Sequence, residues 1–173
     1  MKNNETEIFK RYIMEALIIL LEKKKLGDIT IKEITNKAGV NRSTYYRNFD
    51  SKEEIITYFY RYILNKCITM QSSTKKEDHL LNVFNQFLNY KKELLCLHKN
   101  KLSYLLLEVL NDFFSEEIKE NNFDVDFEIY YHTGGIFNTI LLWLDDQMKT
   151  LPIQLVKKSL EILPKDFKPF LSN

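Results

Sequence analysis

Residues 42–48 carry the side chains with the most specific chemistry in this chain. If the segment is helical, one face of it is polar and consists of Arg42, Ser43, Thr44, Arg47 and Asn48. Arginine can pair with guanine O6 and N7, asparagine can pair with adenine, and a threonine methyl group can contact thymine. This face is therefore suited to the major groove of duplex DNA. Helical hairpins with surface Arg and Lys also occur in other helical proteins, so the pattern alone leaves both interpretations open.

Groups suited to binding phosphate flank this segment. Tyr46 places a hydroxyl at the end of a rigid ring, and Lys52 stands in the first turn of the next expected helix. Amide groups at a helix N-terminus also favour anions. A lysine at that position opposes the helix dipole, so a bound phosphate would explain its presence there. Thr30 and Lys32 begin the preceding helix and could contact the opposite strand.

Two short helices joined by a tight turn must position these groups. Thr30 and Glu33 form a capping box, which predicts a helix that begins after Thr30. Gly39 suits the left-handed residue that ends this helix, and Asn41 is a good N-cap for the next one, over 42–48. Tyr45 and Phe49 are four residues apart, so both can turn inward. The pattern is typical of a helix-turn-helix.

The rest of the chain is predicted to be helical as well. Only 4 Gly and 3 Pro are present, too few for the many turns of a sandwich or barrel. Apolar spacing and capping residues predict further helices at about 6–25, 52–70, 77–90, 91–98, 101–120, 124–149 and 152–163. The expected fold is all-α with about nine helices. It divides into an N-terminal three-helix helix-turn-helix domain, residues 1–50, and a helical regulatory and dimerisation domain, residues 51–173.

The segment from Ile29 to Ile55 resembles the DNA-binding domain of the TetR/AcrR family of bacterial transcriptional regulators. The resemblance rests on ITIKEI, AGV, STYYRNF and SKEEI at family-like spacings, and it covers about residues 8–62. It implies a cytoplasmic homodimer whose third helices enter successive major grooves of a near-palindromic operator. It also implies a repressor released by a small-molecule ligand, or an activator that acts through a protein partner. The positions that it places against DNA are Lys32, Arg42, Ser43, Thr44, Tyr46, Arg47, Asn48 and Lys52, whereas Tyr45 packs inward.

Composition and charge agree with a globular chain that has two parts. The 173 residues are 45% hydrophobic and 28% charged. Residues 1–66 hold 13 Lys and Arg against 9 Asp and Glu, whereas residues 67–173 hold 12 against 15. The two cysteines do not form a disulfide framework, and we expect reduced thiols. No signal peptide or membrane span is expected.

Residues 124–149 are the strongest candidate for a dimer interface. Gly134 and Gly135 interrupt a helical pattern, and each costs about 1 kcal/mol relative to alanine. Close approach of a second backbone would offset this cost, although a kinked internal helix is the alternative. With the next helix, the segment resembles the tail of a TetR-like subgroup of low-GC Gram-positive bacteria, in which two helices per subunit form a four-helix interface. The predicted contacts are Gly134, Gly135, Phe137, Asn138, Leu141, Trp143, Leu144, Val156 and Leu160.

Other kinds of site have weaker support. A ligand pocket could be lined by Phe84, Phe87, Tyr90, Leu106, Phe113 and Tyr130, although such residues more often form plain core. The three histidines have no metal-binding spacing, and no metal or other cofactor is expected. No catalytic constellation stands out, so the chain is not expected to be an enzyme. A binding or assembly protein that has lost DNA contact remains an alternative.

Overall fold

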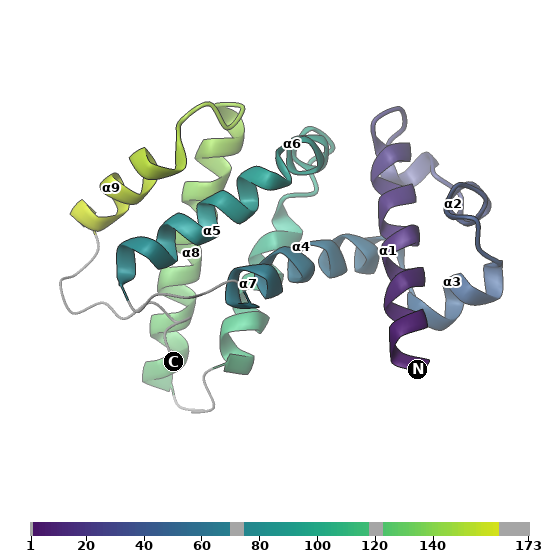
Figure 1. Ribbon diagram of the computed structural model, residues 1–173, viewed down its shortest axis with the longest axis horizontal. Helices are drawn as coiled ribbons and strands as arrows, with labels where there is room; N and C mark the ends of the chain where they lie inside the picture. Colours follow the sequence, from purple (N-terminus) through teal and green to yellow (C-terminus); the bar gives the residue numbers. More distant parts are fainter. Residues whose placement is uncertain (1, 70–74, 118–122, 163–173) are drawn as a thin grey trace.

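The computed structural model describes residues 2–69, 75–117 and 123–162, and within these ranges all regular structure is helical (Figure 1). The α-helices are α1 (Lys2–Leu21), α2 (Ile31–Ala38), α3 (Arg42–Asn48), α4 (Lys52–Thr69), α5 (Lys76–Asn89), α6 (Lys91–Lys99), α7 (Tyr104–Glu117), α8 (Phe123–Asp145) and α9 (Pro152–Ile162). One turn of 3₁₀-helix, η1 (Leu26–Asp28), precedes α2. The prediction of an all-α fold with nine helices is confirmed for the described residues.

Two helices end earlier than their sequence pattern predicts. The backbone N–H groups of Lys23 and Lys24 both donate to the carbonyl of Leu20 at 3.1 Å, so α1 closes in a turn and the three lysines 23–25 lie beyond it. Helix α8 ends at Asp145 rather than near residue 149. Gln147 and Met148 there adopt left-handed backbone, with φ of 56° and 49°. This turn buries the side chain of Met148 in the core.

The helices form two groups that share α4. Helices α1, α2 and α3 pack on one another at one end of the molecule, and α5, α7, α8 and α9 make up the other end (Figure 1). Helix α4 packs on α1 as well as on α5 and α7, and α6 contacts α1, α5 and α8. One continuous cluster of buried apolar side chains runs through both groups. The N-terminal group is therefore held on the rest of the chain by α4 and α6.

Two further findings concern the chain as a whole. None of the described helices is both long and apolar enough to pass through a lipid bilayer. Both cysteines are free thiols: Cys67 is buried and Cys96 is half-buried. Burial raises the pKa of the Cys67 thiol to about 12, which makes it a poor nucleophile at neutral pH.

Candidate DNA-binding site

Helices α2 and α3 have the bounds that their local signals predict. The hydroxyl of Thr30 accepts a hydrogen bond from the backbone N–H of Glu33 at 3.2 Å, and the Glu33 carboxylate accepts one from the backbone N–H of Thr30 at 2.9 Å. This capping box begins α2. Gly39 ends α2 with φ of 68°, which glycine adopts without steric cost. The chain then enters α3 after Asn41, whose side chain makes no capping hydrogen bond.

Aromatic packing fixes the orientation of α3. Tyr45 and Phe49 are almost fully buried, as predicted, and their ring centroids lie 6.4 Å apart. Phe49 in turn meets the ring of Tyr58 from α4 edge-on at 5.7 Å. Because Tyr45 points inward, its neighbour Tyr46 points outward and is 59% exposed. The packing therefore turns the opposite side of α3 towards solvent.

The outward side of α3 carries most of the predicted polar face. Arg42, Ser43 and Arg47 are exposed, and Asn48 is half-buried with its side-chain amide donating to the carbonyl of Thr44 at 2.7 Å. Thr44 differs from the prediction, because it is only 7% exposed. Its hydroxyl accepts a hydrogen bond from the guanidinium of Arg47 at 3.3 Å. Placing Thr44 on the outer face was therefore wrong for the free protein, where it orients Arg47 instead.

Lys52 is held by the protein itself. Its ammonium group donates to the carbonyl of Leu26 at 2.5 Å and to that of Ile29 at 2.9 Å. Lys52 therefore joins the start of α4 to the η1 segment that precedes α2. An ammonium group has three N–H donors, so one remains for a further acceptor such as a phosphate. The sequence pattern indicated only the phosphate role.

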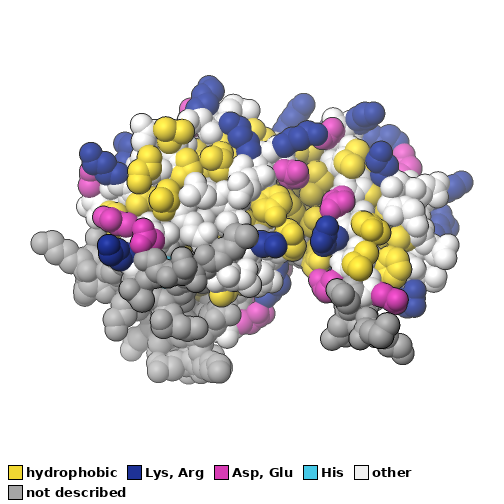
Figure 2. All heavy atoms as spheres, in the orientation of Figure 1, with side chains coloured by type: hydrophobic (Ala, Val, Ile, Leu, Met, Phe, Trp, Pro, Cys, Tyr) yellow, Lys and Arg dark blue, Asp and Glu magenta, His cyan; other side chains and the backbone are white. Residues whose placement is uncertain are grey.

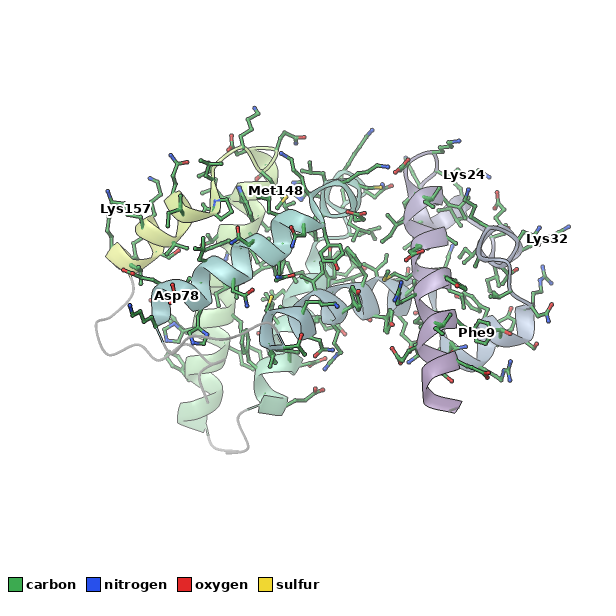
Figure 3. The ribbon with its side chains drawn as sticks, viewed as in Figure 1. Phe9, Lys24, Lys32, Asp78, Met148 and Lys157 are labelled. Carbon is green, nitrogen blue, oxygen red and sulfur yellow. The ribbon has the colours of Figure 1, made fainter. Side chains whose placement is uncertain are left out.

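Basic side chains also lie at and near the start of α2. Lys32 is exposed and projects outward at the same end of the molecule as Lys24 (Figure 3). Lys24 forms a hydrogen-bonded ion pair with Glu33. This contact is the largest cause, and the hydrogen bonds from Thr30 the next largest, of a Glu33 pKa lowered to about 2. Thr30 itself is exposed at the N-cap. A shallow open depression of about 410 Å³ lies between the two helices and is lined by Lys32, Thr35, Asn36, Val40, Asn41 and Arg42.

Comparisons with known proteins agree with this geometry. Residues 13–58 match the family model described as bacterial regulatory proteins, tetR family. A sequence search of curated proteins gives no match. The N-terminal domain of this chain is therefore of the TetR type.

Three solved structures resemble the fold over most of the chain. A TetR transcriptional regulator from Rhodococcus sp. RHA1 has a TM-score of 0.59 at 16% sequence identity, and the match covers 95% of this chain and 100% of that chain. The dihydroxyacetone kinase operon activator DhaS has a TM-score of 0.58 at 14% sequence identity, and the match covers 89% of this chain and 93% of that chain. The fatty acid degradation regulator FadR from Bacillus halodurans has a TM-score of 0.57 at 16% sequence identity, and the match covers 92% of this chain and 96% of that chain. The chain thus has the fold of TetR-type transcriptional regulators.

The predicted dimer residues on α8 and α9 fall into three sets by their exposure. Trp143 and Leu144 are 2% and 1% exposed, and Val156 of α9 is 2% exposed, so these three side chains belong to the core of a single chain. Their role as interface contacts stays a prediction. Gly135 and Asn138 are exposed. The half-buried members of the predicted set are Gly134, Phe137, Leu141 and Leu160.

The outer side of α8 carries a mostly apolar stripe, of which the sequence predicted only Gly135 and Asn138 as interface residues. It consists of Phe127, Tyr131, Gly135, Asn138 and Leu142, which recur every three or four residues and are all exposed. The rings of Phe127 and Tyr131 stack, with centroids 6.4 Å apart, and Leu142 is 71% exposed. A Cβ atom added at Gly134 or Gly135 would meet nothing within 4 Å. The close approach that these glycines were expected to serve is therefore not made within the described chain. We call these five residues the α8 stripe.

The predicted ligand-pocket residues do not enclose one cavity. Phe84, Phe87, Leu106 and Phe113 are buried in the core, which agrees with the alternative that they pack the interior. Tyr130 is 61% exposed and does not lie with them in the core. Tyr90 is half-buried and lines a crevice of about 250 Å³ between α1, α4 and α6. Among the described residues, no three His, Cys, Asp or Glu side chains form a group that could hold a metal ion.

Proposed function

We propose that this protein is a dimeric transcriptional regulator that binds duplex DNA with α3. The observation that carries the proposal is the exposed face of Arg42, Tyr46 and Arg47 on a TetR-type helix-turn-helix at one end of the molecule. Dark blue basic side chains lie along this end (Figure 2). The family and fold point to a regulator rather than to an enzyme.

The dimensions of α3 suit the major groove. Its seven residues span about 10 Å at a rise of about 1.5 Å per residue, and the groove is about 12 Å wide. We assign base contacts to Arg42 and Arg47, with Ser43 and Asn48 beside them, while Thr44 orients Arg47 from below. Phosphate contacts fall to Thr30, Lys32, Tyr46 and Lys52. We take residues 1–50 as the DNA-binding domain and 51–173 as the regulatory and dimerisation domain. Helix α4 belongs to the second range and packs on α1 of the first.

A second copy of the chain is the proposed partner of the α8 stripe. The stripe exposes two aromatic rings and a leucine around a glycine, so a second helix can approach its backbone closely. Phe137, Leu141 and Leu160 are half-buried in one chain and would be covered further in a dimer. Two helix-turn-helix units in one dimer would contact half-sites about 34–36 Å apart on a near-palindromic operator.

The proposed mode of action is repression relieved by a small-molecule ligand in the cytoplasm. The C-terminal half, proposed to be of the low-GC Gram-positive type, would receive the ligand. The dihydroxyacetone kinase operon activator DhaS is among the similar structures, which keeps activation through a protein partner as the second candidate. A reporter fused to the target promoter separates the two modes. Deleting the gene raises expression if the protein represses and lowers it if the protein activates.

A mobility-shift titration tests DNA binding directly. The probe is a fragment from the gene's own neighbourhood that contains an inverted repeat, with a scrambled fragment as competitor. Arg42→Ala should lower affinity by about 1–3 kcal/mol and relax the base preference at one position per half-site. Lys149→Ala removes an exposed charge in the turn after α8 and should leave affinity unchanged. Equal binding to both fragments at every salt concentration would contradict the proposal.

A further inference from the structure

A half-enclosed crevice lies where α1 of the DNA-binding domain faces α4 and the start of α6. Its volume is about 250 Å³. The buried side chains of Met14, Ile18 and Phe59 form its floor. In the middle of the molecule, Figure 2 shows yellow apolar side chains with dark blue and magenta charged side chains around them. The crevice therefore combines an apolar floor with a charged rim.

Aromatic rings form the wall of the crevice opposite α1. Tyr62 on α4 and Tyr90, between α5 and α6, line it and are half-buried. The ring of Tyr90 meets the ring of Phe59 edge-on at 5.7 Å and that of Tyr62 edge-on at 6.0 Å. Because the three rings hold one another in place, the wall offers a rigid surface for an apolar or aromatic group.

The crevice is part of the junction that holds α1 on the rest of the chain. Near the end of α1, the carbonyl of Leu21 accepts a hydrogen bond from the side-chain amide of Asn100 at 3.1 Å. Glu22 forms an ion pair with Lys92 of α6 at 2.8 Å, and both of these side chains line the crevice. A molecule bound in the crevice would therefore contact the DNA-binding domain and the C-terminal helices at once.

Three charged side chains of the rim have no partner in the part of the chain that the structure describes. Arg11 and Glu15 of α1 and Glu93 of α6 line the crevice, and none of them forms an ion pair or a side-chain hydrogen bond there. Arg11 and Glu15 are one helical turn apart, but the order with the cation first is the less favourable one for pairing. One guanidinium and two carboxylates are thus available to a ligand.

We propose that the crevice binds a small zwitterion, a molecule that carries a carboxylate and an ammonium group on an apolar body. The guanidinium of Arg11 can hold the carboxylate through two parallel hydrogen bonds. The carboxylates of Glu15 and Glu93 receive the ammonium group, and the apolar body lies between the floor and the aromatic wall. Sites for drug-sized ligands measure about 300–1,000 Å³, so this smaller crevice suits a molecule the size of an amino acid.

The site lies outside the core of the C-terminal half and gives a ligand a direct route to the DNA-binding domain. Helix α1 packs on α2 and α3 as well as on α4 and α6. A ligand that bridges α1 and α4 changes how α1 is held, and by reciprocity operator binding changes the affinity for the ligand by the same factor. This regulatory part of the inference rests on the proposed function, whereas ligand binding does not and is tested without DNA.

Three probes that share a phenyl ring test the site on the full-length protein. Phenylalanine carries both charges, phenethylamine only the ammonium group and phenylpropionate only the carboxylate. Binding at neutral pH is followed through the ¹³C-labelled methionine methyl groups. The Met14 methyl in the floor should shift, whereas Met148, which is buried beside the turn after α8 and does not line the crevice, is the internal control. Phenylalanine should bind about three- to fivefold more tightly than either other probe.

Charge variants assign each group of the zwitterion to its partner. Arg11→Met should weaken phenylalanine and phenylpropionate about three- to fivefold without weakening phenethylamine. Glu15→Gln should weaken phenylalanine and phenethylamine without weakening phenylpropionate. Both side chains are exposed, so the fold should be kept. Lys23→Met removes an exposed charge just beyond α1, outside the crevice, and should change none of the three affinities.

The outcomes separate the ligand site from the proposed function. No shift of the Met14 methyl with any probe, phenylalanine no tighter than both other probes, or an equal loss for all three probes in Arg11→Met overturns the site. Saturating phenylalanine should change operator affinity about fivefold or more in the wild type and less in Arg11→Met. An operator affinity that phenylalanine leaves unchanged overturns the regulatory part. If the probes bind as expected and no operator is bound at all, the proposed function fails instead.

Discussion

Replacing Lys52 by methionine should destabilise the DNA-binding domain as well as weaken DNA binding. The ammonium group of Lys52 donates to two carbonyls, those of Leu26 and Ile29, from a half-buried position. Hydrogen bonds to charged groups contribute about 1.5–3 kcal/mol each, and solvent reduces this for a half-buried side chain. Methionine keeps the length of the side chain and removes both donors. We expect the free energy of unfolding to fall by about 2–3 kcal/mol.

Urea unfolding followed by circular dichroism measures this loss, and amide hydrogen exchange locates it. Protection should fall first in η1 and α2, which Lys52 connects to α4. Lys32→Met is the matched control, because Lys32 is exposed on α2 and is proposed to bind only phosphate. The control should lose operator affinity and keep its unfolding midpoint. A Lys52→Met protein as stable as the wild type would refute the structural role and leave Lys52 with the phosphate contact alone.

Three more variants probe separate parts of the fold. Gly135→Leu should convert the proposed dimer to monomers in analytical ultracentrifugation without loss of helical structure, because a Cβ atom added at this position meets no described atom within 4 Å. Gly27→Leu, where an added Cβ is equally unobstructed, should stay dimeric. A dimeric Gly135→Leu protein would refute the α8 interface. Glu33→Gln should lower the unfolding midpoint most near pH 7. Lys24 and Thr30 lower the pKa of Glu33 from 4.5 to about 2, so the carboxylate stabilises the folded state above pH 4.5. This stabilisation is lost as the pH falls from 4.5 to about 2. A decrease in the unfolding midpoint of Glu33→Gln as large at pH 2 as at pH 7 would contradict this. Gly39→Ala should destabilise by about 1–2 kcal/mol in urea, because φ there is 68°, and an unchanged midpoint would show that the turn relaxes.

Local signals in the sequence were enough to predict the helix-turn-helix. The Thr30–Glu33 capping box and the left-handed Gly39 act within a few residues, so the bounds of α2 and α3 follow from them. The alternation of Tyr45 and Tyr46 between core and solvent follows from helical periodicity. These features need no knowledge of the rest of the fold.

Features of the fold that depend on contacts between distant residues were not predicted from the sequence. Lys52 meets carbonyls more than 20 residues earlier in the chain, and the His98–Asp145 pair joins helices 47 residues apart. No local spacing predicts such partners. The inward and outward sides of α8 were also hidden, because the segment is apolar on most of its surface. Trp143 is buried with its ring edge-on to that of Phe84 from α5, whereas Leu142 is exposed, a distinction that depends on the tertiary structure.

Hydroxyl-radical footprinting on a selected operator tests the central claim most directly. The operator would be selected from genomic fragments by the purified protein, then footprinted with the wild type and with Arg47→Ala. We predict two protected patches on one face of the duplex, centred about one helical turn apart, which weaken together in the variant. Protection without a sequence preference, or a wild-type footprint from Arg47→Ala, would contradict the assignment of α3 as the surface that reads DNA.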